Sequence, residues 1–520
     1  MPVPSSPARS ERRSRQRSGE KKRRRKKIWF GLGIVVVAGA GIGAWLLISD
    51  NKKTAAPPVS TTSTIPTTTT TTKPPYTGWV DPASAFTPYY QATVAGLLTF
   101  RGNPTRNYYG AGPVPIAPKE LWRYPQAAMC SFSEDKGETT NWCGTGWTGQ
   151  PAIFERDGRT WVVFGAYDRA VHFVDAATGQ DILPPFFTGD LIKGSVTVDP
   201  DGFPLIYTGS RDGFFRAIAI DRLVPTELWK LSAAAVSPIK WNDDWDGSAL
   251  VLRDYLFVGG ENSQIHIAKL NRSNGVDGLV TVAPQLVFNS PGWDDELLAA
   301  VGSEVSIENS VAISGNTLYF ANSGGLVQGW DIAPLLAGMG PPIRTFRFWT
   351  GDDTDASIVV DEFGMLYGGS EWERRNDRSR EVGQMWKLNP TLPDPLVWTQ
   401  SDNALEKAGV WGTPGIVGDL IIYTTYSGRA IGLDRNTGAI RWEKKLAAPL
   451  MGSPVIVDGV WIQGDCGGWL RGYDVSNTLI DPPEIWQVGL GSCIESTPAV
   501  WKGRIVVGTR GGLVYSLGDG

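Results

Sequence analysis

One complete copy of a recurring unit runs from residue 412 to residue 442 and reads GTPGIVGDLIIYTTYSGRAIGLDRNTGAIRW. Its apolar segments are separated by the turn sequences Gly418-Asp419 and Ser427-Gly428, and a polar turn, Asn436-Thr437-Gly438, precedes its last segment. Short apolar segments bounded by Gly, Asp and Asn are typical of β-strands joined by tight turns. The unit therefore predicts a small antiparallel sheet with three strands and a fourth, outer strand that contains Trp442.

The unit recurs often enough to predict a closed ring. Similar units begin near Gln150, Gly194, Gly247, Asn309, Ala356, Gly452 and Ser496, which makes eight copies together with the one at Gly412. Their spacing of roughly 40–60 residues is that of four-stranded propeller blades. We therefore predict an all-β fold, an eight-bladed β-propeller of four-stranded blades.

The two ends of the repeat region predict how the ring closes. The eighth unit stops after its third strand, at residues 514–518, so its outer strand is missing. Residues 119–124, KELWRY, have the character of the outer strands at residues 227–230 and 484–487. We expect this N-terminal strand to complete the last blade, because pairing the two ends removes exposed sheet edges.

Two turn sequences carry a family resemblance. Residues 434–442 (DRNTGAIRW) and 175–179 (DAATG) resemble the Asp-x-x-Thr-Gly-x-x-x-Trp docking motif of pyrroloquinoline quinone (PQQ)-type repeats, and residues 100–106 (FRGNPTR) resemble the lead-in of the same superfamily. The resemblance covers residues 95–520. It implies the fold of the quinoprotein alcohol dehydrogenases and of the propeller lipoprotein of the bacterial outer-membrane assembly machinery. It implies no activity, because one fold hosts many functions.

The N-terminal residues predict a membrane anchor. Residues 1–27 hold 12 Lys or Arg against two Glu, whereas the remainder holds 37 Lys or Arg against 51 Asp or Glu. Residues 28–48 form an uncharged apolar run of about 21 residues, close to the ~20 that cross a hydrocarbon core. Because the basic cluster precedes this run, we predict a single-pass plasma-membrane protein with a cytoplasmic N-terminus and an extracytoplasmic remainder. A cleaved signal peptide is the alternative, although its apolar region usually has only ~7–15 residues.

Composition divides the chain into four parts. We predict a basic cytoplasmic tail at residues 1–27, a transmembrane signal-anchor helix at 28–48, a disordered Thr/Pro-rich stalk at 49–78 and the propeller at 79–520. The stalk has too few apolar residues to bury a core, and its glycosylation is left open. We expect no nucleic-acid partner, because the basic tail is tethered at the membrane and has no fold of its own.

The sequence contains no recognisable catalytic constellation. Its only two histidines, His172 and His266, occupy equivalent third-strand positions, where the repeat requires a bulky strand former. The adjacent cysteine pair that the resemblance would imply for a quinoprotein dehydrogenase is missing. We therefore expect no PQQ cofactor and favour a non-enzymatic protein.

Positions just before the first strands offer the best candidate site. Two residues before each strand opens lie Thr148, Lys193, Asp246, Glu308, Asp355, Trp411, Met451 and Glu495. Because first strands line a propeller channel, these positions ring one of its mouths. We predict a ligand or cation site formed by Lys193, Asp246, Glu308, Asp355, Trp411 and Glu495. Converging carboxylates at Asp246, Glu308 and Asp355 suit Ca²⁺; a merely solvated acidic rim is the alternative, since Asp243, Asp244, Glu304, Asp352 and Asp353 lie nearby.

The four cysteines all follow the predicted span. An even number of cysteines in an oxidising compartment indicates disulfides. Cys130 and Cys143 lie in one loop before the first blade, whereas Cys466 and Cys493 lie on the same face of blades seven and eight. The topology therefore predicts the pairs Cys130–Cys143 and Cys466–Cys493.

Together these features predict a non-catalytic binding scaffold or receptor in the bacterial cell envelope. Its partner would be an envelope protein, a peptide or a glycan. Several tryptophans in or near the mouth loops offer an aromatic platform, with ordinary loop packing as the alternative: Trp142, Trp147, Trp241, Trp245, Trp293, Trp372 and Trp411. Two other functions stay open, a PQQ- and Ca²⁺-dependent dehydrogenase and an envelope sensor.

Overall fold

The computed structural model describes residues 75–520 except 136, 147 and 148. The chain divides into two units, Met1–Thr72 and Lys73–Gly520, and the described residues belong to the second. Within them, no helix has the length and apolar character needed to cross a membrane. The predicted tail (1–27), transmembrane helix (28–48) and most of the stalk (49–78) lie outside the described residues, so the anchor stays a prediction.

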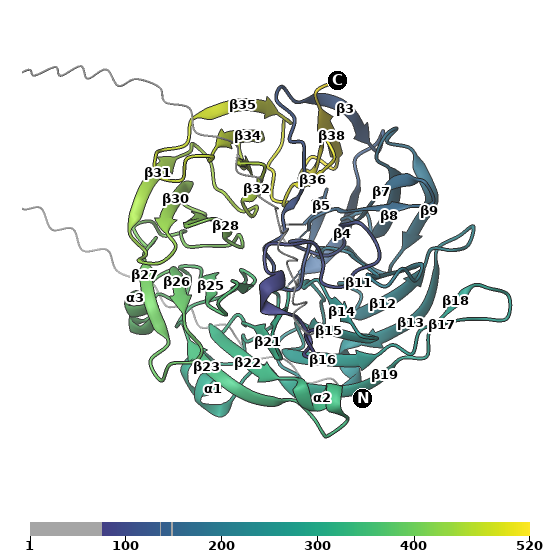
Figure 1. The fold of residues 1–520 in the computed structure, drawn as a ribbon, viewed down its shortest axis with the longest axis horizontal. Helices are drawn as coiled ribbons and strands as arrows, with labels where there is room; N and C mark the ends of the chain where they lie inside the picture. Colours follow the sequence, from purple (N-terminus) through teal and green to yellow (C-terminus); the bar gives the residue numbers. More distant parts are fainter. Residues whose placement is uncertain (1–74, 136, 147–148) are drawn as a thin grey trace, which may run out of the picture. The chain divides into compact units, whose positions relative to one another are not determined.

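The second unit is an eight-bladed propeller (Figure 1). Blade 1 consists of β6 (Ala152–Arg156), β7 (Arg159–Gly165), β8 (Ala170–Asp175) and β9 (Asp181–Phe187), and blade 2 consists of β10 (Thr197–Val198), β11 (Leu205–Ser210), β12 (Phe214–Ala219) and β13 (Thr226–Ser232). Blade 3 consists of β14 (Leu250–Leu252), β15 (Tyr255–Gly259), β16 (Gln264–Lys269) and β19 (Gln285–Pro291), and blade 4 consists of β20 (Ala312–Ser314), β21 (Thr317–Phe320), β22 (Leu326–Asp331) and β23 (Ile343–Trp349).

Blades 5 to 8 continue the same antiparallel order from the axis outward. Blade 5 consists of β24 (Val359–Val360), β25 (Leu366–Gly369), β26 (Met385–Leu388) and β27 (Leu396–Gln400), and blade 6 consists of β28 (Gly415–Val417), β29 (Leu420–Thr424), β30 (Arg429–Asp434) and β31 (Ile440–Lys445). Blade 7 consists of β32 (Val455–Val457), β33 (Val460–Gly464), β34 (Trp469–Asp474) and β35 (Glu484–Gly489), and blade 8 consists of β36 (Ala499–Trp501), β37 (Arg504–Gly508), β38 (Val514–Gly518) and β3 (Lys119–Tyr124). The predicted eight blades are thereby confirmed.

Smaller elements decorate the ring. They are the hairpins β4 (Cys130–Asp135) with β5 (Glu138–Cys143) and β17 (Ser273–Asn274) with β18 (Val280–Thr281), the helices α1 (Asp295–Val301), α2 (Ala333–Ala337) and α3 (Asp377–Val382), and the 3₁₀ turns Pro82–Ser84 and Ala233–Ala235. Two further short strands, β1 (Gly96–Leu97) and β2 (Gly110–Ala111), join the innermost strands of blades 1 and 8.

The ring closes through the predicted N-terminal strand. β3 pairs antiparallel with β38, with Trp122 opposite Ser516. Trp122 then packs on the turn between β8 and β9 of blade 1, where its indole Nε1 donates to the carbonyl oxygen of Ala176 at 2.9 Å. A Cβ at Gly179, whose φ is +72°, would come within 2.8 Å of the Trp122 ring. The glycine of the docking motif is therefore required both by its left-handed backbone and by the tryptophan of the preceding blade.

Residues 96–111 fill the middle of the ring and were not predicted to do so. Between β1 and β2 the chain places two fully buried arginines, Arg101 and Arg106, against the innermost strands. Arg101 donates to the carbonyl oxygens of Pro454 (2.6 Å) and Pro414 (2.5 Å), in blades 7 and 6. Arg106 donates to backbone oxygens of blades 3 and 4. We call residues 96–111 the plug, because they occupy the axis that the first strands line.

Candidate functional site

We define the mouth face as the end of the ring at which the innermost strand of each blade begins. Six of the residues predicted for the site precede such strands: Lys193, Asp246, Glu308, Asp355, Trp411 and Glu495, before β10, β14, β20, β24, β28 and β36. Thr148 lies outside the described residues. The turns between second and third strands reach the same face, because neighbouring strands are antiparallel. They add side chains that sequence alignment of the first strands had missed.

The first group on this face is centred on Lys193. Its Nζ lies 2.8 Å from Asp246 Oδ2, 3.2 Å from Glu261 Oε1 and 3.4 Å from Asp244 Oδ2. These three carboxylates are buried and converge closely enough to share one cation, and the ammonium takes that place. Burial opposes the charge on Lys193, but the carboxylates outweigh it and raise its pKa well above the usual value. Glu261 comes from the turn after β15, which the first-strand pattern does not cover.

The second group is the acid cluster, which we define as Glu308, Asp353, Asp355 and Glu371. Burial and the mutual repulsion of these carboxyls raise the pKa of Asp353, Asp355 and Glu371 well above the usual values. Glu308 accepts hydrogen bonds from the hydroxyls of Ser306 (2.6 Å) and Ser323 (3.2 Å). Asp355 is 8 % exposed, and its buried Oδ1 has no hydrogen-bond partner in the described part of the chain. Arg374 is the one cation among the main influences on these three pKa values, and it acts on Asp353 alone. Among the described residues, the cluster therefore holds more acidic groups in low dielectric than nearby cations can neutralise.

The three carboxylates predicted to hold Ca²⁺ are divided between these groups. Asp246 belongs to the Lys193 group, whereas Glu308 and Asp355 belong to the acid cluster. The two groups still interact electrostatically, since the charge on Glu308 raises the pKa of both Asp246 and Asp355. The carboxylates that converge within one ligand shell are instead Asp244, Asp246 and Glu261. Ca²⁺ binding at Asp246, Glu308 and Asp355 stays a prediction.

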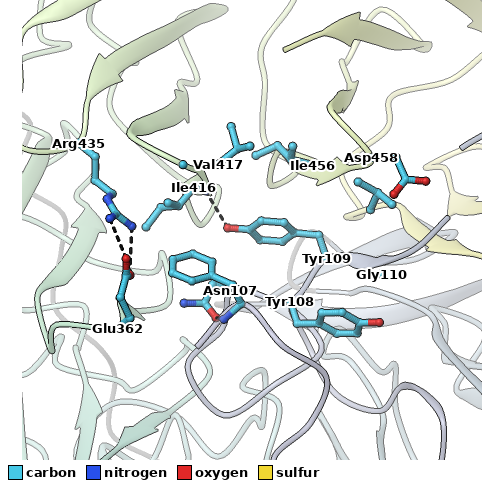
Figure 2. A pocket seen from close by; sticks show the side chains of 13 residues that line it. Asn107, Tyr108, Tyr109, Gly110, Glu362, Ile416, Val417, Arg435, Ile456 and Asp458 are labelled. Atoms are coloured by element: carbon cyan, nitrogen blue, oxygen red, sulfur yellow. Dashed lines mark hydrogen bonds and ion pairs between the residues drawn. The ribbon is translucent and has the colours of Figure 1, made fainter. Parts of the chain in front are cut away.

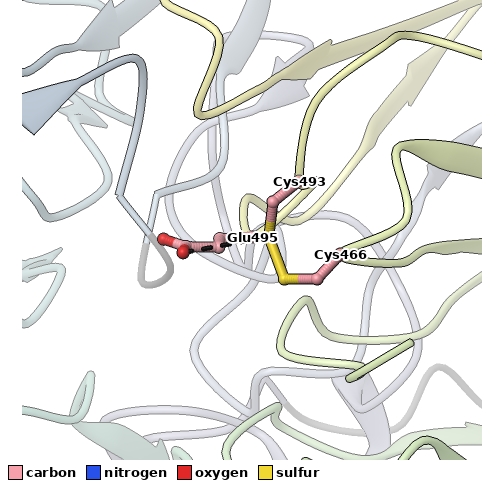
Figure 3. Close-up of side chains that lie close together, drawn as sticks. All are labelled: Cys466, Cys493 and Glu495. Carbon is pink, nitrogen blue, oxygen red and sulfur yellow. Dashed lines mark hydrogen bonds between the residues drawn. A yellow bond between two sulfur atoms is a disulfide. The ribbon is translucent and has the colours of Figure 1, made fainter.

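Both predicted disulfides are present. Cys130 bonds to Cys143 across β4 and β5, with an S–S distance of 2.02 Å, and Cys466 bonds to Cys493 at 1.97 Å. The second disulfide joins blades 7 and 8 beside Glu495 (Figure 3). Glu495 and Arg510 form an ion pair at 3.0 Å. Burial raises the pKa of the Glu495 carboxyl, and Arg510 opposes this effect. Glu495 thus belongs to a paired, half-buried site distinct from the acid cluster.

Trp411 lines a pocket between blades 5 and 6. Its ring lies 5.2 Å from the ring of Tyr426, and both face a cavity of about 320 Å³ that Glu371 also lines. Nearer the axis, a second cavity of about 10 Å³ is lined by Asp355 and Trp411. Of the two alternatives for the mouth-face tryptophans, ordinary packing holds for Trp245, which is 1 % exposed and packs on Phe215. Trp147 lies outside the described residues.

The two histidines are buried in the blades. His172 is 4 % exposed and bonds to Asp168 at 3.0 Å and to the hydroxyl of Tyr124 at 2.9 Å. His266 is fully buried, and burial lowers its pKa to about 3. Both side chains stand against neighbouring strands and away from the acid cluster, in keeping with a structural role.

A further pocket lies on the opposite face, where sequence analysis placed nothing. Its cavity has a volume of about 420 Å³, and the Tyr109 ring of the plug lines it together with Ile416 and Ile456 (Figure 2). The ion pair between Arg435 and Glu362, at 2.9 Å, closes one side. The lining mixes apolar and polar side chains and includes Asp458, while its arginine is already paired with Glu362.

Comparisons with known proteins agree with this architecture. A family model described as "Outer membrane protein assembly factor BamB" matches residues 393–478, which include blade 6 and most of blade 7. No curated protein sequence matches the chain. The resemblance to PQQ-type repeats is thereby confirmed for this region of the propeller.

Solved structures share the fold at low identity. Quinohemoprotein alcohol dehydrogenase ADHIIG from Pseudomonas putida HK5 is 11% identical with a TM-score of 0.55, covering 85% of this chain and 81% of that chain. Quinohemoprotein alcohol dehydrogenase from Comamonas testosteroni is 12% identical with a TM-score of 0.53, covering 82% and 80%. A europium-containing methanol dehydrogenase is 12% identical with a TM-score of 0.53, covering 82% of this chain and 98% of that chain. Identities this low indicate a common fold and carry no activity across.

The axial part of the mouth face does not fit the quinone of these dehydrogenases. The cavity between Asp355 and Trp411 measures about 10 Å³, which is about the space of one water molecule. The four cysteines form two disulfides between residues distant in sequence, so no adjacent pair is available. We derive no catalytic step through PQQ.

Proposed function

We propose that the chain is a membrane-anchored, extracytoplasmic propeller that serves as a non-catalytic binding scaffold or receptor in the bacterial cell envelope. The observation that carries this proposal is the plug. A propeller that works on a small substrate needs room on its axis, whereas here residues 96–111 occupy the axis and hydrogen-bond to the innermost strands. Binding is left to the faces of the ring.

The mouth face is the better binding surface of the two. It holds the acid cluster, in which only Asp353 has a cation among its main influences, and the pocket at Trp411. In the pocket on the opposite face, the arginine is already paired with Glu362. Buried charge without a partner favours an oppositely charged ligand, because binding restores the lost solvation. An envelope protein, peptide or glycan that presents positive charge suits this face.

Site-specific photo-crosslinking of the full chain in intact cells tests the proposal. A photoreactive residue at Glu406, whose side chain is 87% exposed at the mouth face, should give a discrete crosslinked product. The matched position on the opposite face is Phe363, which is 71% exposed and should give none. Absence of any product at Glu406, or equal products at both positions, would contradict a mouth-face scaffold.

Two assays address the alternatives left open by the sequence. Reconstitution of the full chain with PQQ and Ca²⁺ should give no dye reduction with alcohols or sugars, and clear reduction would establish the dehydrogenase. For Ca²⁺ alone, thermal stabilisation of the wild type that is lost in the double variant Asp246→Asn, Asp355→Asn would support the predicted site. A wild type without any response to Ca²⁺ would end that idea.

A further inference from the structure

The pocket between blades 5 and 6 combines a buried acid with aromatic walls. We call it the aromatic–carboxylate pocket, and its defining residues are Glu371, Trp372, Glu373, Trp411 and Tyr426. Its volume of about 320 Å³ lies at the lower end of the ~300–1,000 Å³ typical of ligand sites. It opens at the mouth face beside the acid cluster, with which it shares Glu371.

Glu371 is the unusual member of this pocket. The residue is 7 % exposed, yet its carboxylate has neither a hydrogen bond nor an ion pair within the described part of the chain. The charges that act on it, from Asp355, Glu373, Glu308 and Asp352, are all negative. Carboxylates buried to this degree are normally paired or hydrogen-bonded. Its isolation therefore points to a cation that comes from outside the chain.

The walls favour an organic cation over a bare ion. Trp411 and Tyr426 stand with ring centroids 5.2 Å apart and planes inclined by 34°, and both rings line the cavity. The third ring, Trp372, already has the guanidinium of Arg380 at 5.5 Å from its centroid. Ring faces next to a carboxylate attract ammonium and guanidinium groups by cation–π and ionic forces together.

The cations on the rim of the pocket do not neutralise Glu371. Arg375 donates to the carbonyl oxygens of Glu406 and Trp372 and lies 4.0 Å from the Glu406 carboxylate. Lys407 is exposed on the rim and makes no ion pair in the described structure. Its flexible side chain is the natural competitor for an incoming cation.

We propose that the aromatic–carboxylate pocket binds a lysine or arginine side chain presented by a partner polypeptide. The ammonium or guanidinium group pairs with Glu371, and the aliphatic part of the side chain lies against Trp411 and Tyr426. This inference rests on the proposed scaffold function and names the chemistry that its mouth face recognises. Because Glu371 must be ionised to pair, binding should tighten as the pH rises from 5 to 8.

Calorimetric titration of the purified full chain tests the proposal. The probes are Nα-acetyl-arginine amide and Nα-acetyl-lysine amide, with Nα-acetyl-norleucine amide as the neutral analogue. Glu371→Gln should weaken binding of the two cationic probes at least tenfold, whereas Asp394→Asn, which changes an exposed acid outside the pocket, should change it less than threefold. Lys407→Ala should leave binding unchanged or make it tighter.

The outcomes separate the inference from the proposed function. Equal binding of the neutral probe, or unchanged affinity in a Glu371→Gln variant that melts no lower than the wild type, would overturn the inference. Binding of putrescine but of neither amino-acid amide would also overturn it, because the ligand would then be a free polyamine. If the amides fail while the crosslink at Glu406 persists, only this pocket is refuted; loss of the crosslink refutes the scaffold itself.

Discussion

Replacement of Asp355 by Asn should stabilise the propeller. Asp355 is 8 % exposed, its Oδ1 lacks a hydrogen-bond partner among the described residues, and its neighbours Asp353 and Glu308 are also acidic. Asparagine has nearly the same shape, carries no charge and donates hydrogen bonds from its amide. The substitution thus removes a buried charge and keeps the packing.

The magnitude follows from the missing partner and from the raised pKa. A buried polar group without a hydrogen bond costs about 1–3 kcal/mol, and each pH unit by which the folded pKa exceeds the unfolded one corresponds to about 1.4 kcal/mol. Since the pKa of Asp355 is raised, its cost is absent below pH ~4 and grows as the pH rises towards the folded pKa. We expect Asp355→Asn to gain about 1–3 kcal/mol at pH 7.5 and nothing at pH 4.

Scanning calorimetry of wild type and variant between pH 4 and pH 8 provides the measurement. If the ring melts as one unit of this size, 1–3 kcal/mol corresponds to roughly 1–3 °C in Tm. Tm of the wild type should also fall relative to that of the variant as the pH rises. Added cations should reduce the difference, because they compensate the same charge.

A neighbouring residue provides the matched control. Asp352 is fully buried, but its carboxylate accepts hydrogen bonds from the backbone N–H groups of Glu373 (3.2 Å), Arg374 (2.8 Å) and Arg375 (3.2 Å). Asp352→Asn should therefore destabilise the protein by about 1–3 kcal/mol at pH 7.5. If Asp355→Asn destabilises the protein to the same extent, the folded protein stabilises the Asp355 carboxylate, and the predicted cost of burying it is refuted.

Three further predictions concern the ring itself. Trp122→Phe should cost about 1–3 kcal/mol more than Trp442→Phe in calorimetric melting. The indole of Trp122 donates to a carbonyl oxygen, whereas that of Trp442 has no partner among the described residues; equal losses would contradict the docking role. Replacing Cys466 and Cys493 by Ser should lower the free energy of unfolding by about 3–4 kcal/mol, because the bond closes a loop of 27 residues, and an unchanged urea midpoint would argue against this. Lys193→Met should cost about 3–5 kcal/mol at pH 7.5 and less at pH 5, because it leaves buried carboxylates unpaired at neutral pH; a loss independent of pH would count against that cause.

The blades could be predicted from the sequence because each is a local antiparallel sheet with its own turns. The Gly418-Asp419 turn and the apolar runs around it specify β28 and β29 without long-range information. Closure was predictable for the same reason, since residues 119–124 have the pattern of an outer strand whose partner is missing. The docking motif also holds at Gly438, where a Cβ would come within 2.7 Å of the Trp398 ring.

The plug and most of the candidate site could not be predicted in this way. β1 and β2 have two residues each, too short for any periodic signal, and Arg101 reaches partners more than 300 positions away in sequence. Glu261 and Glu371 come from turns between second and third strands, whose lengths differ between blades. Only three-dimensional closure brings these turns beside the first-strand positions. The pairing of Lys193 with Asp246 likewise follows from the contact between blades 2 and 3.

The distribution of charge links stability to binding. On the axis, Arg101 and Arg106 are buried, and neither has an acidic partner in the part of the chain that the structure describes. Burial lowers the pKa of both, and the opposing influences come from Tyr109 and Tyr89. Their hydrogen bonds go to other residues of the plug and to backbone oxygens next to the innermost strands of blades 3, 4, 6 and 7. They therefore hold blades together and do not pair with the acid cluster. Arg101 and Arg106 thus stabilise the ring at its axis, and their charges are not available to neutralise the acid cluster. A partner that brings positive charge to the mouth face would compensate the carboxylates of the acid cluster. For this reason we expect the acid cluster to take part in binding.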